Sequence, residues 1–384
     1  MISNKSVNKN TELLKSAFKE YYFRYSKNIQ VPTRIHEREF GYMRFGSGMV
    51  RHIAFRNVGE LLATLIKEVP SDVYCSNAYY RFPTHTLQEK QWLGADLIFD
   101  VDVKDLHLPC DPTHSYFFCA NCGNVSERNS KLCPSCNNAT ILHQISIPCR
   151  KCNVALKREI KHLIDLLTGD LGVEEKSIES YFSGNNGFHL HILDKSFHSL
   201  DSQARSDIVN YIIGMGMMTE SIGVRKLSGD DFLIKFPRSG LSYGWRRRIA
   251  NKLGIDQSSK SKLSSIVQQE GGYYGFKEKL VKTTKEMGVR IDPVVTTDIH
   301  RVFRMSGTLN SKSGFIKMKC TDLELFDPSI DACLLGDKEV LIETRASIKL
   351  KLKHQSFNIK KKIITRLPLY AAVYLICKGL ADAV

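Results

Sequence analysis

The segment LIFDVDV, residues 97–103, places two carboxylates two positions apart inside an otherwise apolar run. In an extended strand, side chains at positions i and i+2 point to the same face, so Asp100 and Asp102 share one face while Leu, Phe and Val side chains fill the other. Two like charges at this spacing repel each other. A divalent cation such as Mg²⁺ or Mn²⁺ resolves this conflict, because it accepts hard oxygen ligands and is typically shared with substrate phosphates. A hydrated strand edge is the alternative interpretation of an isolated pair of this kind.

A second polar stretch, SGNNGFHLHI at residues 183–192, has the composition of a phosphate-binding turn. Its two glycines allow backbone N–H groups to approach an anion closely, and a serine hydroxyl lies beside them. His189 and His191 are two positions apart and therefore face the same side of the outgoing strand. The turn could hold a triphosphate, although an ordinary β-hairpin would explain the same glycines.

Further along the chain, TTDIHRVFRMSGTLNSKSG at residues 296–314 contributes a third carboxylate, Asp298, followed by several cations. The cations are Arg301, Arg304 and Lys312. An acid set among bases in a turn-rich segment indicates one metal ligand together with phosphate-binding side chains. Salt bridges on a protein surface are the alternative.

Eight potential metal ligands separate the first two stretches: Cys110, His114, Cys119, Cys122, Cys133, Cys136, Cys149 and Cys152. Tetrahedral zinc takes four ligands, so eight of them indicate two structural sites. The inner four cysteines form two C-x-x-C pairs separated by ten residues, which is the spacing of a zinc ribbon. The nested arrangement assigns these four to one site and the outer four residues to the other. The competing arrangement groups Cys110 and His114 with Cys119 and Cys122.

The composition is that of a basic globular protein, with 384 residues and 55 Lys and Arg against 40 Asp and Glu. The formal charge of +15 favours a polyanionic partner, nucleic acid before a membrane surface, although a basic protein without such a partner has the same composition. The first residues contain no apolar run of signal-peptide length, and no segment is apolar over about 18–20 residues. A cytoplasmic protein without membrane contact is expected, in which the C-x-x-C pairs bind metal and do not form disulfides.

The elements that must position these residues follow from periodicity and turn signals. Helices are expected at residues 11–26, 57–69 and 154–172, and an apolar helix within 367–384. Strands are expected on both sides of the Gly-Ser-Gly turn within 42–55, at 92–103, and on both sides of the Ser-Gly-Asn-Asn-Gly turn. Residues 240–290 are polar and helix-leaning, which indicates an insertion outside the main sheets.

Four segments in order resemble the catalytic small subunit of archaeal and eukaryotic replicative DNA primases: EREFGYMRFGSGMVRHIAF, WLGADLIFDVD, YFSGNNGFHLHI and VVTTDIHRVFRMSGTLNSKSG. Together they span roughly residues 37–317. The resemblance implies an α+β fold, the archaeo-eukaryotic primase core of mixed or antiparallel sheets flanked by helices, with an inserted zinc-binding module and a helical insertion. The expected segments are core (1–108, 153–239 and 291–345), zinc-binding insertion (109–152), helical insertion (240–290) and a basic C-terminal segment (346–384).

The resemblance also implies the function, a template-directed nucleotidyltransferase that synthesises primers for DNA replication by a two-metal mechanism. The implied partners are single-stranded DNA template, nucleoside triphosphates and a large primase subunit. Asp100, Asp102 and Asp298 match the family's ligands for catalytic Mg²⁺ or Mn²⁺. The matching nucleotide-binding positions are Ser183, Gly184, Gly187, His189, Arg51, Glu39, Arg304 and Lys312. A repair or mobile-element polymerase of the same superfamily, and a zinc-ribbon adaptor without chemistry of its own, are the alternatives.

Three asparagines depart from the family's pattern. Many relatives carry basic residues where Asn185 and Asn186 stand here, and a histidine where Asn310 stands. Asparagine keeps the hydrogen bonding but loses the charge. This leaves open which cations bind the nucleotide in this chain.

Overall fold

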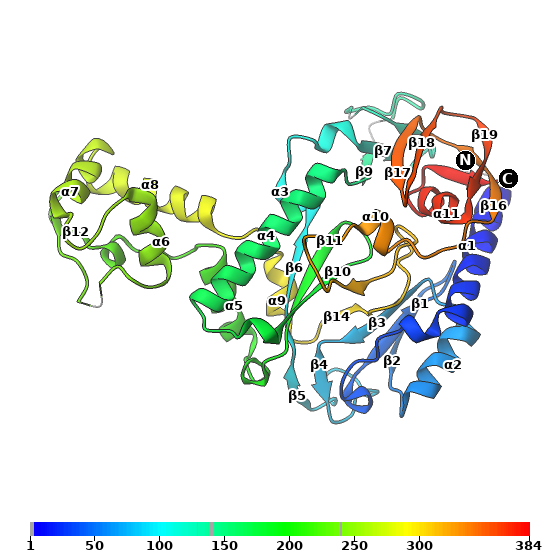
Figure 1. Ribbon diagram of the computed structural model, residues 1–384, viewed down its shortest axis with the longest axis horizontal. Coiled ribbons are helices and arrows are strands. Elements are labelled where there is room, and N and C mark those ends of the chain that lie inside the picture. The colour runs from blue at the N-terminus through cyan, green and yellow to red at the C-terminus, as the bar shows by residue number, and fades with distance from the viewer. Residues whose placement is uncertain (1–3, 129, 139–141, 239) are drawn as a thin grey trace. The chain divides into compact units, whose positions relative to one another are not determined.

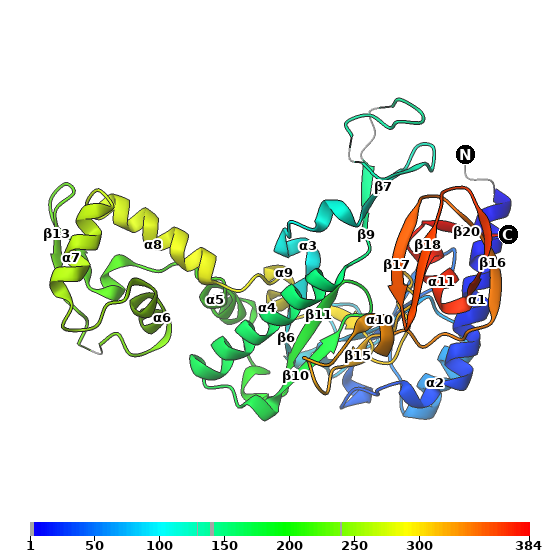
Figure 2. The same cartoon turned by 45° about the horizontal axis from the view of Figure 1, so that its top comes forward.

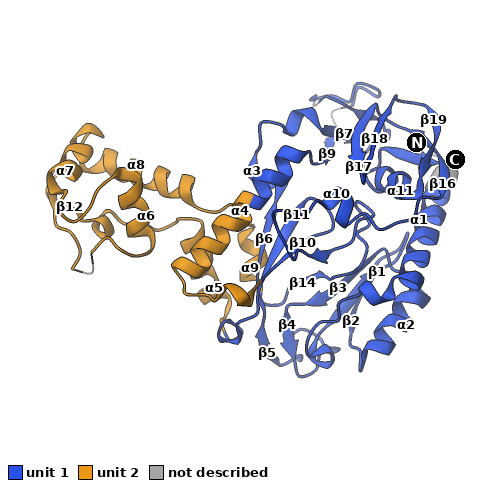
Figure 3. Cartoon of the chain, viewed as in Figure 1, with its two compact units in different colours: residues 1–157, 179–199, 299–384 blue, residues 158–178, 200–298 orange. Residues whose placement is uncertain are grey.

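The computed structural model describes residues 4–128, 130–138, 142–238 and 240–384 (Figure 1). The chain divides into two compact units, which Figure 3 shows in different colours. Unit 1 comprises residues 1–157, 179–199 and 299–384, and unit 2 comprises residues 158–178 and 200–298. The chain therefore leaves unit 1 twice and returns each time.

The first main sheet of unit 1 has the strand order β14-β3-β1-β2, and its neighbouring strands are antiparallel. Its strands are β1 (Phe40–Met43), β2 (Met49–Ile53), β3 (Asp72–Ser76) and β14 (Val302–Arg304). The predicted strand pair around the Gly-Ser-Gly turn is confirmed as β1 and β2. Helix α2 (Val58–Glu68) follows, and Asn57 caps it by accepting a hydrogen bond from the Glu60 backbone N–H.

The second main sheet of unit 1 has the strand order β15-β10-β11-β6. Its strands are β6 (Leu97–Asp102), β10 (Ile178–Phe182), β11 (Gly187–Ile192) and β15 (Met318–Lys319). Strand β11 runs antiparallel to β6, and β10 runs antiparallel to β15. The predicted hairpin is therefore confirmed as β10 and β11. The single strand expected at 92–103 was wrong in its extent, because the structure has two strands there, β5 (Trp92–Ala95) and β6, which belong to different sheets.

One face of the second sheet is mostly apolar, which explains why apolar and polar residues alternate along β6 and β11. Phe99 lies opposite Leu190 in the β6–β11 register, and neither side chain has exposed surface. Phe188 on the same face contacts the ring of Phe326 with centroids 6.0 Å apart. Burial of each such side chain stabilises the fold by about 1.5–3 kcal/mol, so a shift of register by one residue would be strongly unfavourable.

The remaining elements of unit 1 surround these sheets. Helix α1 (Asn4–Arg24) packs against α11 (Leu369–Cys377) and β20 (Ala381–Ala383). A third sheet has the order β19-β16-β20, and β17 and β18 form a hairpin. The other bounds are β4 (Ala78–Tyr80), β5 (Trp92–Ala95), α3 (Val103–Leu106), α10 (Pro328–Asp331), β16 (Glu339–Thr344), β17 (Ile348–Leu352), β18 (Gln355–Ile359) and β19 (Ile364–Pro368).

A small three-stranded sheet carries the cysteine block of unit 1. Its order is β8-β7-β9, with bounds Ser115–Cys119 for β7, Val125–Ser126 for β8 and Leu142–Ser146 for β9. Figure 2 shows this sheet leading away from the two main sheets. Strands β7, β8 and β9, which lie within the segment expected to bind zinc, therefore pair with one another.

Unit 2 is mainly helical and has its own core. Helix α4 (Arg150–Gly169) begins in unit 1 and ends in unit 2. The other bounds in unit 2 are α5 (Ser202–Ile212), β12 (Val224–Lys226), β13 (Phe232–Ile234), α6 (Gly244–Leu253), α7 (Lys260–Gln269), α8 (Tyr273–Met287) and α9 (Pro293–Thr297). Trp245, Leu263 and Phe276 are buried together in its core. The expected helical insertion, residues 240–290, lies within this larger unit.

The C-terminal segment differs from the single apolar helix expected there. Helix α11 covers only Leu369–Cys377, while β19 precedes it and β20 follows it. Gly379, with a φ of 70°, ends the helix on its C-terminal side, and both flanking strands pair with β16. No helix of the described residues is both long and apolar enough to cross a membrane.

Candidate active site

Four polar side chains lie on the face of β6 and β11 that is opposite the apolar one. In the antiparallel register His189 lies directly across from Asp100, and Gly187 lies across from Asp102. His191 follows two positions after His189 and shares its face. We call the face that carries Asp100, Asp102, His189 and His191 the carboxylate face.

A buried lysine joins the two histidines of the carboxylate face. Lys317 is only 2% exposed, and its Nζ lies 3.1 Å from His189 Nδ1 and 3.4 Å from His191 Nε2. Burial lowers the pKa of both histidines well below the ordinary value and lowers the pKa of Lys317 to about 7. A neutral His189 that accepts from Lys317 at Nδ1 carries its proton on Nε2, which lies 3.5 Å from Asp100 Oδ1.

The two carboxylates fit a divalent cation on electrostatic grounds. Burial raises the pKa of Asp102, which means that the surroundings disfavour its charged form in the absence of a cation. The positive charge of Lys104 opposes this effect only in part. A hard cation would stabilise the ionised carboxylates and accept their oxygens as ligands, so Mg²⁺ or Mn²⁺ matches both the charge and the donor type.

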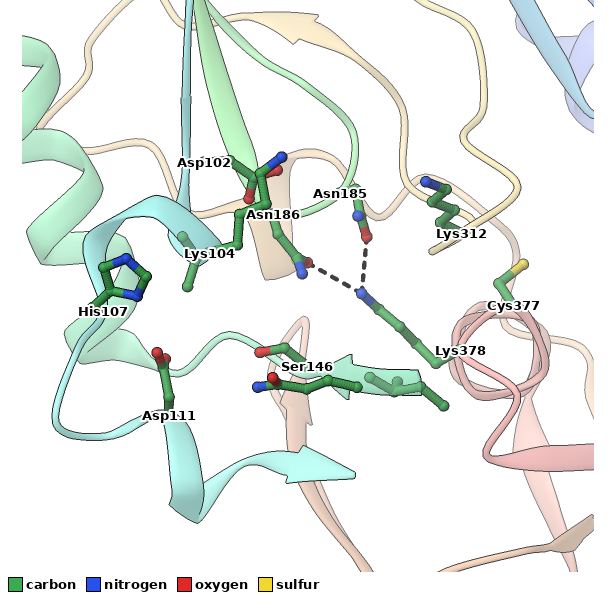
Figure 4. A pocket seen from close by; sticks show the side chains of 13 residues that line it. Asp102, Lys104, His107, Asp111, Ser146, Asn185, Asn186, Lys312, Cys377 and Lys378 are labelled. Atoms are coloured by element: carbon green, nitrogen blue, oxygen red, sulfur yellow. Dashed lines mark hydrogen bonds between the residues drawn. The ribbon is translucent and has the colours of Figure 1, made fainter. Parts of the chain in front are cut away.

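A pocket of about 620 Å³ lies beside Asp102 within unit 1 (Figure 4). Its lining includes three lysines, namely Lys104, Lys312 and Lys378, and the two asparagines of the hairpin turn, Asn185 and Asn186. Its size is in the range of small-molecule sites in proteins. The pocket therefore combines a candidate metal ligand at one edge with cations and amides suited to an anion.

The hairpin turn is held in place by two glycines that no larger residue could replace without a shift. A Cβ at Gly187 would meet the carbonyl oxygen of Val101 at 2.6 Å. Gly184 has a φ of 86°, and a Cβ there would approach the backbone N of Lys317 at 3.1 Å. The turn closes through a hydrogen bond from the Ser183 backbone N–H to the Gly187 carbonyl, and the Ser183 hydroxyl accepts from the Asn185 N–H.

Arg304 is mostly buried, with a side-chain exposure of 10%, and holds the turn that follows it. Its Nη1 lies 2.6 Å from Asp72 Oδ1 and donates to the Leu309 carbonyl at 2.9 Å. Asp72 also accepts a hydrogen bond from the Ser311 backbone N–H. The next residue, Lys312, lines the pocket, so Arg304 and Asp72 together position the segment that carries Lys312.

Glu39 is 1% exposed and lies within a cluster of cations. Its Oε1 accepts from Arg51 Nε at 3.0 Å, and its Oε2 accepts from Lys90 Nζ at 2.5 Å. Burial alone would raise the pKa of Glu39, but the hydrogen bonds from Lys90 and Arg51 keep it below the ordinary value. Arg51 is half-exposed, so its position on β2 is set from the buried side by Glu39.

Asp298 is the last residue of unit 2. It caps the C-terminal end of α9, and its backbone N–H donates to the Val294 carbonyl. The chain enters unit 1 immediately afterwards, where the His300 ring stacks on Tyr80 with centroids 5.9 Å apart. The third expected metal ligand thus stands at the connection between unit 2 and strand β14.

The eight cysteine and histidine ligands gather into two separate groups. One group consists of Cys110, His114, Cys149 and Cys152, and the other of Cys119, Cys122, Cys133 and Cys136, with the ligand atoms of each within 4.8 Å of one another. These are the sets of the nested arrangement, which we call the outer site and the inner site. Each set could hold one tetrahedral zinc ion, and no position remains open for a substrate.

The zinc content of the purified chain is expected to be two equivalents, because each site supplies four protein ligands. Metal analysis of protein prepared without chelators measures this directly. Cys133→Ser is expected to retain one equivalent, since the inner site would lose a ligand while the outer site stays complete. One equivalent in the unaltered chain would contradict the assignment of two sites.

Three lysines of this region were not identified from the sequence. Lys90 contacts Glu39, Lys317 contacts both histidines, and Lys378 lines the pocket. Each contact joins positions at least 51 residues apart in the chain. Of the three lysines, Lys317 has a weak sequence signal for burial, because it directly follows the apolar pair in GFIK.

Comparisons with known proteins identify the family of this chain. The profile of the family described as DNA primase small subunit matches residues 141–319. A protein of Nitrosopumilus maritimus named DNA primase small subunit PriS is 43% identical over 96% of this chain and 98% of its own length. Proteins of the same name from Cenarchaeum symbiosum and Archaeoglobus fulgidus are 39% and 30% identical, over 97% and 95% of this chain and 98% and 96% of their own lengths.

Proposed function

This chain belongs to the DNA primase small-subunit family and is the catalytic subunit of a DNA primase, and on that premise we propose that it adds nucleotides by a two-metal mechanism at the carboxylate face. The reaction is nucleotidyl transfer on a single-stranded DNA template. The 3′-hydroxyl of the growing strand attacks the α-phosphate of a nucleoside triphosphate, the P–O bond to the β-phosphate breaks, and pyrophosphate leaves.

The observation that carries the proposal is the pairing of β6 with β11. It sets two carboxylates and a neutral histidine on one face, directly beside a pocket with several cations. Such a face combines ligands for hard cations with donors for phosphate oxygens. An adaptor that only binds nucleic acid would have no need to bury Asp102 at a cost to its charged form.

We assign the catalytic ions to Asp100, Asp102 and Asp298. Mg²⁺ or Mn²⁺, when bound, stabilises negative charge on the reacting phosphate and its attacking and leaving oxygens. Asp100 and Asp102 are two residues apart on β6, so the rigid sheet holds their separation constant. Asp298 is assigned from the family resemblance and from its place at the start of the chain segment that leads into β14.

The phosphates of the incoming nucleotide are assigned to the hairpin and the pocket. Ser183, Gly184 and Gly187 form the turn, and His189 offers an Nε2–H donor because Lys317 occupies its Nδ1. Lys312, which also lines the pocket, contributes a further cation.

Three further residues are assigned to the same site. Arg51 contributes a cation that Glu39 orients, and Arg304 positions the turn that carries Lys312 while it adds positive charge near His189. A guanidinium with a donor to spare can pair with phosphate even when one edge is held by a carboxylate.

The catalytic core, the zinc ions and the partner subunit are proposed from the same family membership. We propose that the two four-stranded sheets form the primase catalytic core and that zinc fills the outer and inner sites as a structural ion. A large primase subunit is the proposed partner, as the word "small subunit" in the family's name implies. Initiation without a primer is expected to need this second subunit, so the test below uses a template with an annealed primer.

The decisive test is templated extension of an annealed primer by the purified chain. With a poly(dT) template and added Mg²⁺ or Mn²⁺, we expect incorporation of adenosine nucleotides and at least about tenfold less incorporation of cytidine nucleotides, because base pairing selects the substrate. The divalent ion should be left out of the reaction and then added back, because a chelator would also remove zinc from the protein. Incorporation that ignores the template sequence, or that persists without added divalent ion, would contradict the proposal.

A further inference from the structure

The hairpin turn that should face phosphate contains no cation of its own. Its two central residues, Asn185 and Asn186, are neutral. Both direct their Oδ1 atoms toward the Nζ of Lys378, at 2.8 and 3.1 Å (Figure 4). Lys378 follows helix α11, so the charge at this turn comes from a segment more than 190 residues away in the chain.

Lys378 is a buried ammonium group, only 7% exposed, and none of the described residues pairs a carboxylate with it. Its Nζ contacts the two asparagine oxygens and lies over the face of the Tyr374 ring. By contrast, buried Lys90 is paired with the carboxylate of Glu39. A buried charge held only by neutral groups is unfavourable, and an anion that enters the pocket would offset this cost.

The neighbours of Lys378 indicate what kind of anion the pocket takes. Lys104 and Lys312 line the same pocket, and Asp102 lies at its edge. A ligand that lies between lysines and a divalent ion held by Asp102 must carry several negative charges in a short chain. A triphosphate has this property, and the volume of about 620 Å³ can contain it.

We propose that Lys378 binds the triphosphate of the incoming nucleotide and supplies the positive charge that the hairpin turn lacks. This inference rests on the proposed function, because it takes the nucleotide to lie at the carboxylate face. Asn185 and Asn186 hold the ammonium group in place through their side-chain oxygens. The C-terminal segment after β16 is therefore part of the nucleotide site and not only part of the packing around α1.

The test compares Lys378→Met with Lys338→Met in the full-length chain. Methionine keeps the length and the apolar stem of the side chain but removes the charge. Lys338 is exposed, lies in the same C-terminal part of unit 1 and does not line the pocket, so Lys338→Met is the matched loss of one positive charge. Both variants should be assayed for primer extension and for binding of a nucleoside triphosphate and the matching monophosphate.

We expect Lys378→Met to raise the KM for the nucleotide by about tenfold to a hundredfold, which is what the loss of a charge-assisted hydrogen bond to phosphate implies. The kcat should change by less than about threefold, and binding of the monophosphate should stay near the wild-type level. Lys338→Met should match the wild-type chain in all three measurements. An unchanged KM in a folded Lys378→Met protein would overturn the inference, while templated activity of the wild type would still support the proposed function.

Two further results separate the alternatives. If Lys378→Met weakens binding of single-stranded DNA and leaves the nucleotide KM unchanged, the pocket binds template phosphates and the inference is wrong. If the variant does not fold, amine labelling of the wild-type chain replaces it, and we expect a nucleoside triphosphate with Mg²⁺ to protect Lys378 from acylation. Equal protection by the nucleoside without phosphates would overturn the inference.

Discussion

Replacement of both Asp100 and Asp102 by asparagine is expected to reduce templated primer extension by at least about a thousandfold. Bound divalent ions contribute several kcal/mol of transition-state stabilisation, and each 1.36 kcal/mol corresponds to about a tenfold change in rate. Asparagine retains the shape of the side chain but is a much weaker ligand for a hard cation. Primer-extension rates at saturating nucleotide measure the effect.

The matched control for this double variant is Asp194→Asn. Asp194 follows β11 at the end of the strand away from Asp102, and its Oδ1 caps a short turn by accepting from the Ser196 N–H, which asparagine can also do. Extension at the wild-type rate is expected for the control. If the double variant also extended primers at the wild-type rate, the carboxylate face would not be the catalytic site.

The same double variant should be as stable as the wild-type chain, or more so, when no divalent ion is added. Burial raises the pKa of Asp102 in the folded chain above its unfolded value, so its ionisation costs folding free energy once the pH exceeds the unfolded pKa. An asparagine has no charge to desolvate. A loss of activity together with an unchanged or higher Tm would separate a functional role from a structural one.

Asp298→Asn tests the third carboxylate in the same assay. We expect a loss of similar size, because the ligand set needs all three oxygens if two ions are bound. Activity close to the wild-type level would limit the metal site to the two aspartates of β6. The substitution leaves unchanged the Asp298 backbone N–H, which closes the last turn of α9 by donating to the Val294 carbonyl.

Cys152→Ser is the second substitution with a large expected effect, and it acts on stability. Cys152 is fully buried in the first turn of α4, and the outer site brings it together with Cys110 and His114, which precede strand β7 in the chain. Structural zinc contributes directly to folding free energy. We expect the free energy of unfolding to fall by about 3 kcal/mol or more, with the loss of one zinc equivalent.

The inner site provides the comparison for this prediction. Cys133→Ser also removes one zinc equivalent, but the inner ligands lie within residues 119–136 and connect only the two ends of the ribbon loop. A smaller drop in Tm is therefore expected. Thermal unfolding of both variants, with zinc content measured on the same samples, checks the order. Equal drops would show that the two sites stabilise the same cooperative unit.

The parts of the site that depend on local spacing could be predicted from the sequence. An extended backbone has a side-chain period of two, and this alone sets Asp100 and Asp102 on one face of β6. The glycine spacing in Ser-Gly-Asn-Asn-Gly predicts the β10–β11 turn because only glycine accepts its backbone conformation and close contacts. The inner cysteine pairs are equally local, since the C-x-x-C spacing lets both thiolates of a pair reach the same metal ion.

Only the tertiary structure decided which residues complete these local motifs. Strand pairing sets His189 opposite Asp100, and chain packing brings Lys317 to His189 and Lys378 to Asn185. Long-range pairing also makes strands of the segments on both sides of α11, because β19 and β20 hydrogen-bond to β16. A linear sequence determines which faces and turns are available through short-range sterics and periodicity. It does not by itself reveal which buried amine meets which carboxylate or turn, because that depends on contacts between segments that are far apart in the chain.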